Sequence, residues 1–447
     1  MKKYEPTTGA AGSTLVQIEK PIYGGAFLAR VQGKAIFVPL ALVGEEARVR
    51  IAEDKRGYAT AEVEEIVSAS PERVVPRCVH FGACGGCNYQ HTSYAQQLQI
   101  KETILRETLE RGGVAVPEKI DVLSGDAWQY RNRIRLAFDA AGRIGYRGRR
   151  SHTLIPLEEC PIAAPLLVEA ARAVEEVLRL SARGLQPSEI SFFASPDQSA
   201  MLVSVFVRSA AKAPFQKFVR ALVERVPALK GAELVVEDAP QQTRRRAGTK
   251  RARTSEPRTV DRWGETSMNY VAAGRSYRVD VGAFFQVNRW LVDELVAHVT
   301  AGEQGSVAWD LFAGVGLFAR ALSEHFENVV AVEAAPASTA ALEANLRGTS
   351  GKAVKASTAE FLRRAGTGEQ PDLVVVDPPR TGLGPEVAAA LVALRAPRIT
   401  YVSCDPATLA RDLKTLVAGG YAVERMAMAD LFPQTFHLET VVHLHRA

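Results

Sequence analysis

A cysteine stands where a predicted strand ends, in residues 401–406, which read Tyr-Val-Ser-Cys-Asp-Pro. The strand over 398–402 is apolar and β-branched, and a polar turn ends it before a helical pattern begins. A side chain at the carboxyl end of a parallel strand faces the crevice in which α/β proteins bind ligands. Cys404 is therefore placed to act as a nucleophile, and the alternative interpretation is a buried structural thiol.

The other four cysteines form a second group with a spacing of its own. Cys78, Cys84 and Cys87 lie close together with two glycines between the last pair, and Cys160 follows much later, directly before a proline. Four thiolates can bind zinc or an iron–sulfur cluster. Structural zinc sites usually use two close pairs, so this compact trio with one distant cysteine favours a [4Fe–4S] cluster. Zinc stays open as the alternative.

Two acidic residues in the C-terminal third follow apolar strands. Glu333 closes a strand over 329–332, one strand after the glycine turn at 312–316, and can accept hydrogen bonds from ribose hydroxyls. NAD enzymes share this arrangement, but the third glycine that fits a pyrophosphate is missing here. Asp377 opens an Asp-Pro-Pro-Arg turn after the strand 373–376. This turn points to a methyl-donor site more than to a dinucleotide site, and a plain strand-ending turn is the alternative.

The elements that must position these residues differ along the chain. The C-terminal third alternates strands and helices, which predicts a doubly wound parallel sheet, with one helix expected over 317–325. Near the N-terminus a small five-stranded barrel is expected, and such barrels often bind nucleic acid. Its predicted strands, separated by glycines, are 14–19, 26–31, 34–39, 46–51 and 59–67. The stretches 23–30 and 37–45 resemble a TRAM domain, which implies RNA binding.

A basic stretch at 129–150 lies between these two regions. Arg131, Arg133 and Arg135 alternate with apolar residues, so one face of a strand would carry several positive charges, with aromatic residues interleaved. Phosphate contact with base stacking is the functional interpretation, and a solvated strand face is the alternative. Residues 241–258, rich in Arg, Lys, Thr and Ser, are expected to form a disordered basic insert.

Bulk composition sets the remaining expectations. The chain has 447 residues, 47% apolar and 23% charged, which predicts a soluble globular protein of two to three domains. No export signal or membrane span is visible, so we expect a cytoplasmic protein that does not bind membranes and acts as a monomer. Five cysteines without an export signal favour metal binding or catalysis over disulfides. A net charge of +5 permits a polyanionic partner without requiring one.

Five motifs in a fixed order carry a family resemblance. They are Phe-Phe-Gln-Val-Asn at 284–288, the loop at 310–316, Asp-Pro-Pro-Arg at 377–380, Ser-Cys-Asp-Pro at 403–406 and Phe-Pro-Gln-Thr-Phe-His-Leu-Glu-Thr-Val at 432–441. Together with the barrel and the cysteine group, they resemble the RNA uracil-5-methyltransferase family over nearly the whole chain.

The resemblance implies S-adenosylmethionine as methyl donor and 5-methyluridine in RNA as product, with 23S ribosomal RNA as the favoured partner and tRNA as the alternative. It also implies residue roles. Cys404 would be the nucleophile and Glu439 the base that removes a proton from carbon 5. Leu317, after the last glycine of the donor loop, departs from the small polar or amide residue common there. The residues that would bind or border the donor are Gln286, Phe312, Glu333 and Asp377.

The expected fold is thus α/β, with a Rossmann-like methyltransferase domain. The expected domains are a TRAM-like barrel at 12–68, a mixed α+β domain with the cluster at 69–285, and the methyltransferase domain at 286–447. Two other functions compete with this one. A base-amine methyltransferase would have an aromatic residue where Arg380 stands and would not need Cys404. A non-catalytic iron–sulfur RNA-binding protein would need neither Cys404 nor Glu439.

Overall fold

The computed structural model describes residues 13–182, 184–237, 241–243, 251–253, 257–365 and 370–447. The chain forms two compact units. The first comprises residues 1–107 and 432–437, and the second comprises 108–431 and 438–447. Within the described ranges, the helices are too short or too polar to cross a membrane.

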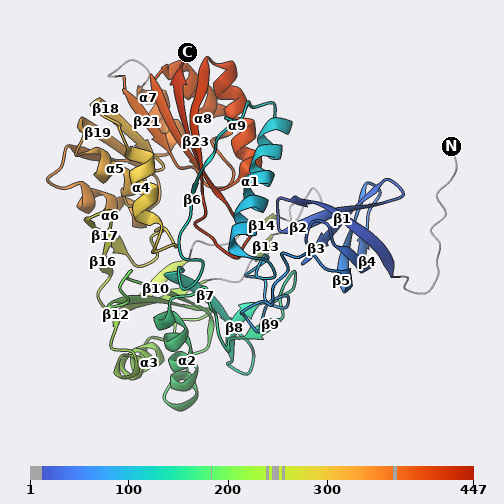
Figure 1. Ribbon diagram of the computed structural model, residues 1–447. Coiled ribbons are helices and arrows are strands. Elements are labelled where there is room, and N and C mark those ends of the chain that lie inside the picture. The colour runs from blue at the N-terminus through green and yellow to red at the C-terminus, as the bar shows by residue number, and fades with distance from the viewer. Residues whose placement is uncertain (1–12, 183, 238–240, 244–250, 254–256, 366–369) are drawn as a thin grey trace. The chain divides into compact units, whose positions relative to one another are not determined.

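A closed five-stranded barrel forms the body of the first unit, as the sequence predicts (Figure 1). Apolar side chains alternate inward along the first half of β1, where Val16 and Ile18 are both buried. Between the first two strands the chain turns at Gly24 and Gly25, whose φ angles are +104° and +82° and therefore suit glycine. The strands pair in the order β1-β2-β3-β5-β4 and span Thr14–Ile22 (β1), Ala26–Val31 (β2), Lys34–Pro39 (β3), Glu46–Asp54 (β4) and Tyr58–Ser68 (β5).

The C-terminal segment 432–437 belongs to this first unit through hydrogen bonds to helix α1, Tyr94–Arg111, and to the chain before it. The side chains of Gln97 and Gln434 bond each other at 3.0 Å, and the Gln97 side-chain oxygen also accepts from the Gln434 amide at 2.9 Å. The buried ammonium of Lys101 donates to the carbonyl of Phe432 at 3.0 Å. This short segment is therefore held by groups some 330 residues away in sequence.

A seven-stranded sheet with two helices on one face forms one part of the second unit (Figure 1). Every second residue of its strands, such as Ile134, Ile190 and Val203, joins a core with helices α2, Pro165–Leu180, and α3, Lys212–Arg225. The strand order is β15-β12-β11-β10-β7-β8-β9, with bounds Arg258–Gly264 (β15), Leu229–Val236 (β12), Met201–Val207 (β11), Pro187–Ala194 (β10), Arg133–Phe138 (β7), Ile144–Arg147 (β8) and Leu154–Pro156 (β9).

An eight-stranded sheet forms the other part of the second unit. Its first five strands are parallel, β24 runs antiparallel to both of its neighbours, β22 and β23, and β6 pairs parallel with β23. The order is β20-β19-β18-β21-β22-β24-β23-β6, with bounds Gly351–Lys355 (β20), Phe326–Glu333 (β19), Gly305–Leu311 (β18), Leu373–Val376 (β21), Arg398–Ser403 (β22), Glu439–Arg446 (β24), Tyr421–Ala429 (β23) and Asp121–Leu123 (β6). The expected doubly wound sheet is present, with one reversed strand, β24.

Helices accompany the strands of this second sheet (Figure 1). Their bounds are Val292–Thr300 (α4), Leu317–Leu322 (α5), Pro336–Leu346 (α6), Thr358–Ala365 (α7), Gly384–Leu394 (α8) and Pro406–Ala418 (α9). Helix α5 ends three residues before the expected 325. A separate hairpin pairs β16, Ser267–Ala272, with β17, Arg275–Asp280.

The basic insert expected at 241–258 lies mostly outside the described residues. The structure describes two short strands in it, β13, Gln241–Thr243, and β14, Arg251–Arg253, which pair antiparallel.

Candidate active site

Strand register brings three of the predicted catalytic and donor-binding residues to one edge of the eight-stranded sheet. Parallel strands β21 and β22 pair Val376 with Tyr401, so Asp377 and the Ser403–Cys404 turn leave the sheet at the same carboxyl end. Strand β24 runs the other way and pairs Thr440 with Ser403. Glu439, its first residue, therefore begins beside the position where Cys404 ends β22.

Burial dominates the electrostatics of this edge. Glu439 is only 4% exposed, and burial, with the nearby Asp377 charge adding to it, raises the pKa of Glu439 well above its ordinary value. Burial likewise raises the pKa of Asp377 to about 7 and that of Cys404 to about 12. The charges of Glu439 and Asp377 push the Cys404 pKa further up, and Arg380 opposes them.

The protein alone therefore holds Cys404 as a thiol at neutral pH, beside carboxyl groups that retain protons unusually well. A thiol must lose its proton before sulfur attacks. A buried carboxyl with a raised pKa is a stronger base once it is ionised. The site thus has a partly buried thiol and a buried carboxyl in neighbouring positions.

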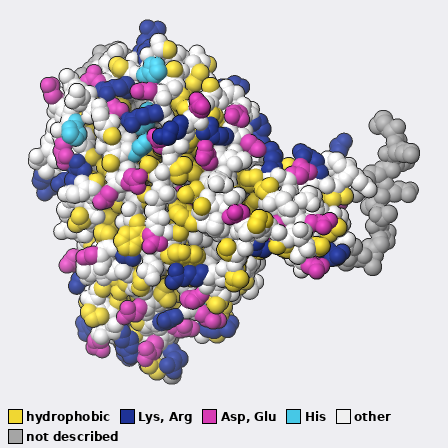
Figure 2. Space-filling model, viewed as in Figure 1, with side chains coloured by type: hydrophobic (Ala, Val, Ile, Leu, Met, Phe, Trp, Pro, Cys, Tyr) yellow, Lys and Arg dark blue, Asp and Glu magenta, His cyan; other side chains and the backbone are white. Residues whose placement is uncertain are grey.

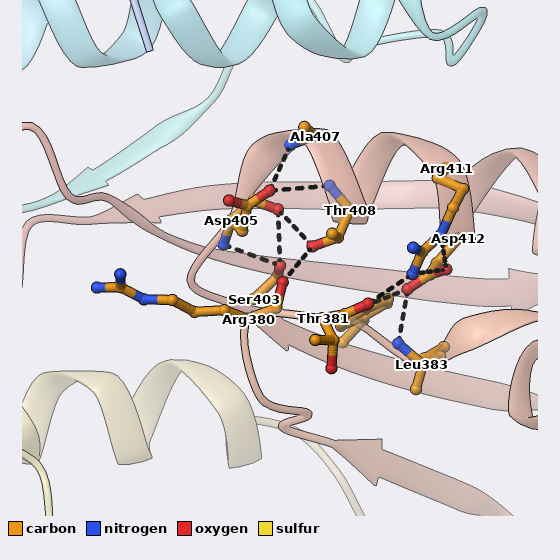
Figure 3. Close-up of polar contacts among 10 residues, drawn as sticks. Arg380, Thr381, Leu383, Ser403, Asp405, Ala407, Thr408, Arg411 and Asp412 are labelled. Atoms are coloured by element: carbon orange, nitrogen blue, oxygen red, sulfur yellow. Dashed lines mark hydrogen bonds and ion pairs between the residues drawn. The ribbon is translucent and has the colours of Figure 1, made fainter. Parts of the chain in front are cut away.

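Hydrogen bonds from helix α9 fix the nucleophile turn and the loop that carries Arg380 (Figure 3). Asp405 caps the helix by accepting from the amides of Ala407 and Thr408 at 3.0 and 2.9 Å. The hydroxyl of Thr408 also lies 3.2 Å from the carbonyl oxygen of Arg380, to which it donates. One helix turn thereby holds both the end of β22 and the loop after β21.

Asp412, one turn further along α9, joins the same two segments (Figure 3). Its buried carboxylate accepts from the Tyr401 hydroxyl at 2.8 Å and from the Leu383 amide at 2.7 Å. The neighbouring Arg411 donates to the carbonyl of Thr381 at 2.8 Å. Neither Asp412 nor Tyr401 was selected from the sequence, where they read as ordinary helix and strand residues.

The predicted donor-binding residues Phe312 and Glu333 follow adjacent strand ends, since β18 and β19 pair Leu311 with Val332. Phe312 has a φ of +66°, a left-handed backbone conformation that is uncommon for a side chain of its size. The Glu333 carboxylate accepts from the amides of Gly314 at 2.9 Å and Ala335 at 2.6 Å. It therefore fixes the glycine turn after β18.

The turn itself has tight steric limits. Gly316 has a φ of +90°, and a Cβ there would lie 2.7 Å from the Leu342 side chain. Leu317, the departure noted in the sequence, is buried and its carbonyl accepts from the Tyr277 hydroxyl at 3.1 Å. Asp310, at the end of β18, bonds the Ala319 amide at 2.8 Å, and burial raises its pKa to about 7.

Gln286 lies on a separate loop, before α4, and is 7% exposed. Its backbone carbonyl accepts from the side-chain amide of Asn132 at 3.0 Å, and the backbone N–H of Asn132 donates to the carbonyl of Val287 at 2.9 Å. Asn132 is fully buried and also bonds the Tyr270 hydroxyl at 2.7 Å. In the sequence, Asn132 reads only as part of the basic stretch. Its position between two arginines was the one signal that it could hold the loop at 286–287.

The four predicted cluster cysteines are divided between the units, with Cys160 in the second and the other three in the first. Across the described residues, no three Cys, His, Asp or Glu side chains are grouped as metal ligands. The donor chemistry still suits a cluster, because the Gly86 amide donates to the Cys84 sulfur at 3.4 Å and the Tyr146 hydroxyl to the Cys160 sulfur at 3.5 Å. The four-cysteine site stays a prediction.

Comparisons with known proteins identify related families and a related fold. A family model described as tRNA (Uracil-5-)-methyltransferase matches residues 265–447, and one described as TRAM domain matches residues 13–63. Among solved structures, the Pyrococcus abyssi tRNA (uracil-54, C5)-methyltransferase with S-adenosyl-L-homocysteine superposes with a TM-score of 0.73 at 23% identity. That comparison covers 96% of this chain and all of the other. The fold is therefore that of a methyltransferase.

Relatives with higher sequence identity than this structure show the family to which the chain belongs. Two are named 23S rRNA (uracil(1939)-C(5))-methyltransferase RlmD. The one from Halomonas elongata is 31% identical over 98% of this chain and 91% of its own length, and the one from Aeromonas salmonicida is 34% identical over 93% and 92%. An uncharacterized RNA methyltransferase of Thermotoga maritima is 31% identical over 96% and 98%. The chain belongs to the RNA uracil-5-methyltransferase family.

Tyr401→Phe tests the bond between β22 and Asp412. Because the hydroxyl donates to a buried carboxylate, its loss should lower the free energy of unfolding by about 2 kcal/mol. Tyr277→Phe is the matched control, since that buried hydroxyl donates to the uncharged carbonyl of Leu317 at 3.1 Å and should cost about 1 kcal/mol. Urea unfolding of both variants gives the comparison. Equal losses would mean that Asp412 does not hold the strand by its charge.

The pH dependence of alkylation tests the buried thiol. The thiolate fraction of a group with a pKa near 12 grows about tenfold per pH unit, so iodoacetamide labelling of Cys404 should climb steeply from pH 7 to 10 without a plateau. Peptide mass spectrometry follows the label at this residue alone. A rate that levels off between pH 9 and 10, as that of a cysteine with a pKa of about 8.5 would, contradicts the raised pKa.

Proposed function

We propose that the protein transfers a methyl group from S-adenosylmethionine to carbon 5 of a uridine in 23S rRNA through a covalent Cys404 adduct. The observation that carries this proposal is the register that starts Glu439 beside the end of the Cys404 strand, at an edge that Asp377 shares. The RlmD relatives support ribosomal RNA as substrate, and the cytoplasm as its place of action follows from that substrate. Transfer RNA is the alternative substrate.

Carbon 5 of uracil is a poor nucleophile, and covalent catalysis divides the difficult step. As Cys404 loses its proton, its sulfur bonds to carbon 6 and the electrons of the carbon 5–carbon 6 double bond move onto oxygen 4. Carbon 5 would then bond to the methyl carbon, and the bond from that carbon to the donor sulfur would break to leave a neutral thioether. S-Adenosylmethionine supplies that electrophilic methyl group and a positive charge, which favours the anionic forms of Cys404 and the buried carboxylates.

After transfer, carbon 5 carries both the methyl group and its original hydrogen. The Glu439 carboxylate takes this proton, the double bond re-forms, and the bond between sulfur and carbon 6 breaks to release Cys404. Phe312, Glu333, Gln286 and Asp377 are proposed to bind or border the donor. Since a paired base shields carbon 5 and carbon 6, the target uridine has to be unstacked before it enters the site.

We further propose that Cys78, Cys84, Cys87 and Cys160 hold a [4Fe–4S] cluster with a structural role. The support is their number, spacing and thiolate chemistry. No step of the methyl transfer uses it. The barrel and the basic stretch at 129–150 are proposed to contact RNA, and the TRAM match supports the first of these.

Glu439→Gln separates the two catalytic roles. Addition and methyl transfer need no base at carbon 5, so this variant should accumulate a protein–RNA adduct that already carries the methyl group. Cys404→Ala should form no adduct, and the double variant should match it. Denaturing gels with mass analysis of the RNA give the readout. Free turnover by Glu439→Gln would assign the base elsewhere, and an unmethylated adduct would place Glu439 in an earlier step.

RNA containing 5-fluorouridine tests the reaction class itself. Fluorine cannot leave carbon 5 as a proton does, so wild-type protein with the donor should form a stable adduct on the target uridine. A base-amine methyltransferase or a non-catalytic RNA-binding protein should give none. Mapping 5-methyluridine in ribosomal and transfer RNA from a deletion strain then decides between the two RNA classes.

Anaerobic purification tests the cluster. We expect a brown protein with about four iron atoms per chain. Cys160→Ser should lose the iron, whereas Cys404→Ser, the same substitution outside the group, should keep it. Stoichiometric zinc without iron in the wild-type protein contradicts the proposal, and that measurement stands even if Cys160→Ser is insoluble.

A further inference from the structure

A pocket of about 280 Å³ lies on the face of the seven-stranded sheet that α2 and α3 leave open. Its floor comes from three neighbouring strands, where Arg135, Ser191 and Ser204 stand side by side across β7, β10 and β11. Val281, Gly282 and Val287 form part of its wall. None of these residues has a role in the reaction described above.

Two arginines cover aromatic rings in this pocket. The guanidinium of Arg133 lies 4.2 Å from the centre of the Phe193 ring, and that of Arg135 lies 4.0 Å from the centre of the Phe206 ring. The Nε of Arg133 is buried and has no hydrogen-bond partner among the residues that the structure describes. Flat guanidinium and aromatic surfaces suit a planar ligand that stacks on them.

Acidic side chains balance the arginines at the pocket, whereas the sequence predicted a strand face with several positive charges. Arg135 donates to Glu189 at 2.5 Å and to Glu237 at 2.9 Å. The buried Glu233 accepts from the pocket hydroxyl of Ser204 at 2.8 Å. The face of the molecule in Figure 2 likewise carries basic and acidic side chains interspersed. Because the charges at the pocket are balanced, they do not favour binding of a phosphate. A neutral heterocycle can still stack on the guanidinium and aromatic surfaces.

The pocket is joined to the predicted donor site through one short segment. Val287 lines the pocket, and Gln286, the residue before it, is predicted to border the donor. Asn132 bonds both carbonyls and stands between the pocket residues Arg131 and Arg133. The pocket and the predicted donor-bordering residue are therefore attached to each other through Asn132.

We propose that this pocket binds an unpaired nucleobase of the substrate RNA that flanks the target uridine. The inference rests on the proposed function for the identity of the target, but the pocket itself can be tested without methyl transfer. Its volume, at the small end of the usual range for ligand pockets, suits a single base better than a larger ligand.

Ser191→Phe tests the site by filling it. Ser191 is central on the floor, and phenylalanine is well tolerated in strands. Ser276→Phe is the matched control, because Ser276 is an exposed strand residue that does not line the pocket. The probe is a fluorescein-labelled single-stranded RNA of eight nucleotides, and its affinity is measured by anisotropy over a range of salt concentrations.

We expect Ser191→Phe to bind this RNA about tenfold more weakly than wild type and Ser276→Phe, the scale of one stacked base. The log–log slope of affinity against salt should be unchanged, because no phosphate contact is lost. Unchanged affinity overturns the proposal, and so does a smaller salt slope, which would make the pocket a phosphate site. Circular dichroism checks that both variants fold.

The flanking position is tested with 5-fluorouridine RNA that carries one abasic nucleotide at successive positions. With wild-type protein, one abasic position should raise the RNA concentration needed for half-maximal adduct about tenfold, and with Ser191→Phe this sensitivity should vanish while the maximal adduct level is retained. If no position is sensitive, the pocket does not hold a flanking base. If wild-type protein forms no adduct with any RNA, the proposed function fails, and the anisotropy result still judges the pocket.

Discussion

The site depends on one feature of strand pairing, the insertion of antiparallel β24 next to the last parallel strand β22. Parallel strands all end at the same edge of a sheet, so further parallel strands would bring only strand ends to it. An antiparallel strand starts at that edge instead. Glu439 can therefore face the Cys404 turn while the rest of β24 is bonded to β22 and β23 on either side. The carboxyl is thus held by a fully paired strand rather than by a loop.

Burial at this edge has a chemical consequence. Three acidic groups, the buried Glu439 and the partly buried Asp377 and Cys404, lie close enough that each anion disfavours the next. Arg380 is the cation that opposes them at Cys404. Its loop is held by Thr408 and Asp412, so α9 sets both the nucleophile and its counter-charge. In the protein alone these three groups retain their protons. A positively charged methyl donor bound nearby would favour their ionised forms.

Sequence patterns predicted local elements well where apolar β-branched runs are bounded by glycine or polar turns. The strands Ala26–Val31, Lys34–Pro39 and Leu373–Val376 have the expected bounds. The order of motifs also predicted the family, which the relatives confirm. Residue roles at the site stay predictions, although register brings Asp377, Cys404 and Glu439 to one edge.

Pairings over long sequence distances could not be predicted. Glu189 and Glu237 lie 54 and 102 residues from Arg135, and without their positions the arginines of β7 read as a uniformly positive face. The hydroxyl of Tyr401 and the carboxylate of Asp412 fit strand and helix patterns equally well without their bond. The same holds for the four predicted cluster cysteines, because their spacing in the sequence does not give the distance between Cys160 and the other three in space.

The chain passes from one unit to the other directly before Glu439, the predicted base. The chain leaves the second unit at Leu431, is held in the first unit over 432–437, and returns at Leu438, which is fully buried. Glu439 is the next residue. Gln97 and Lys101 bond the segment 432–437 within the first unit. Leu438 alone therefore separates this segment from Glu439, the predicted base.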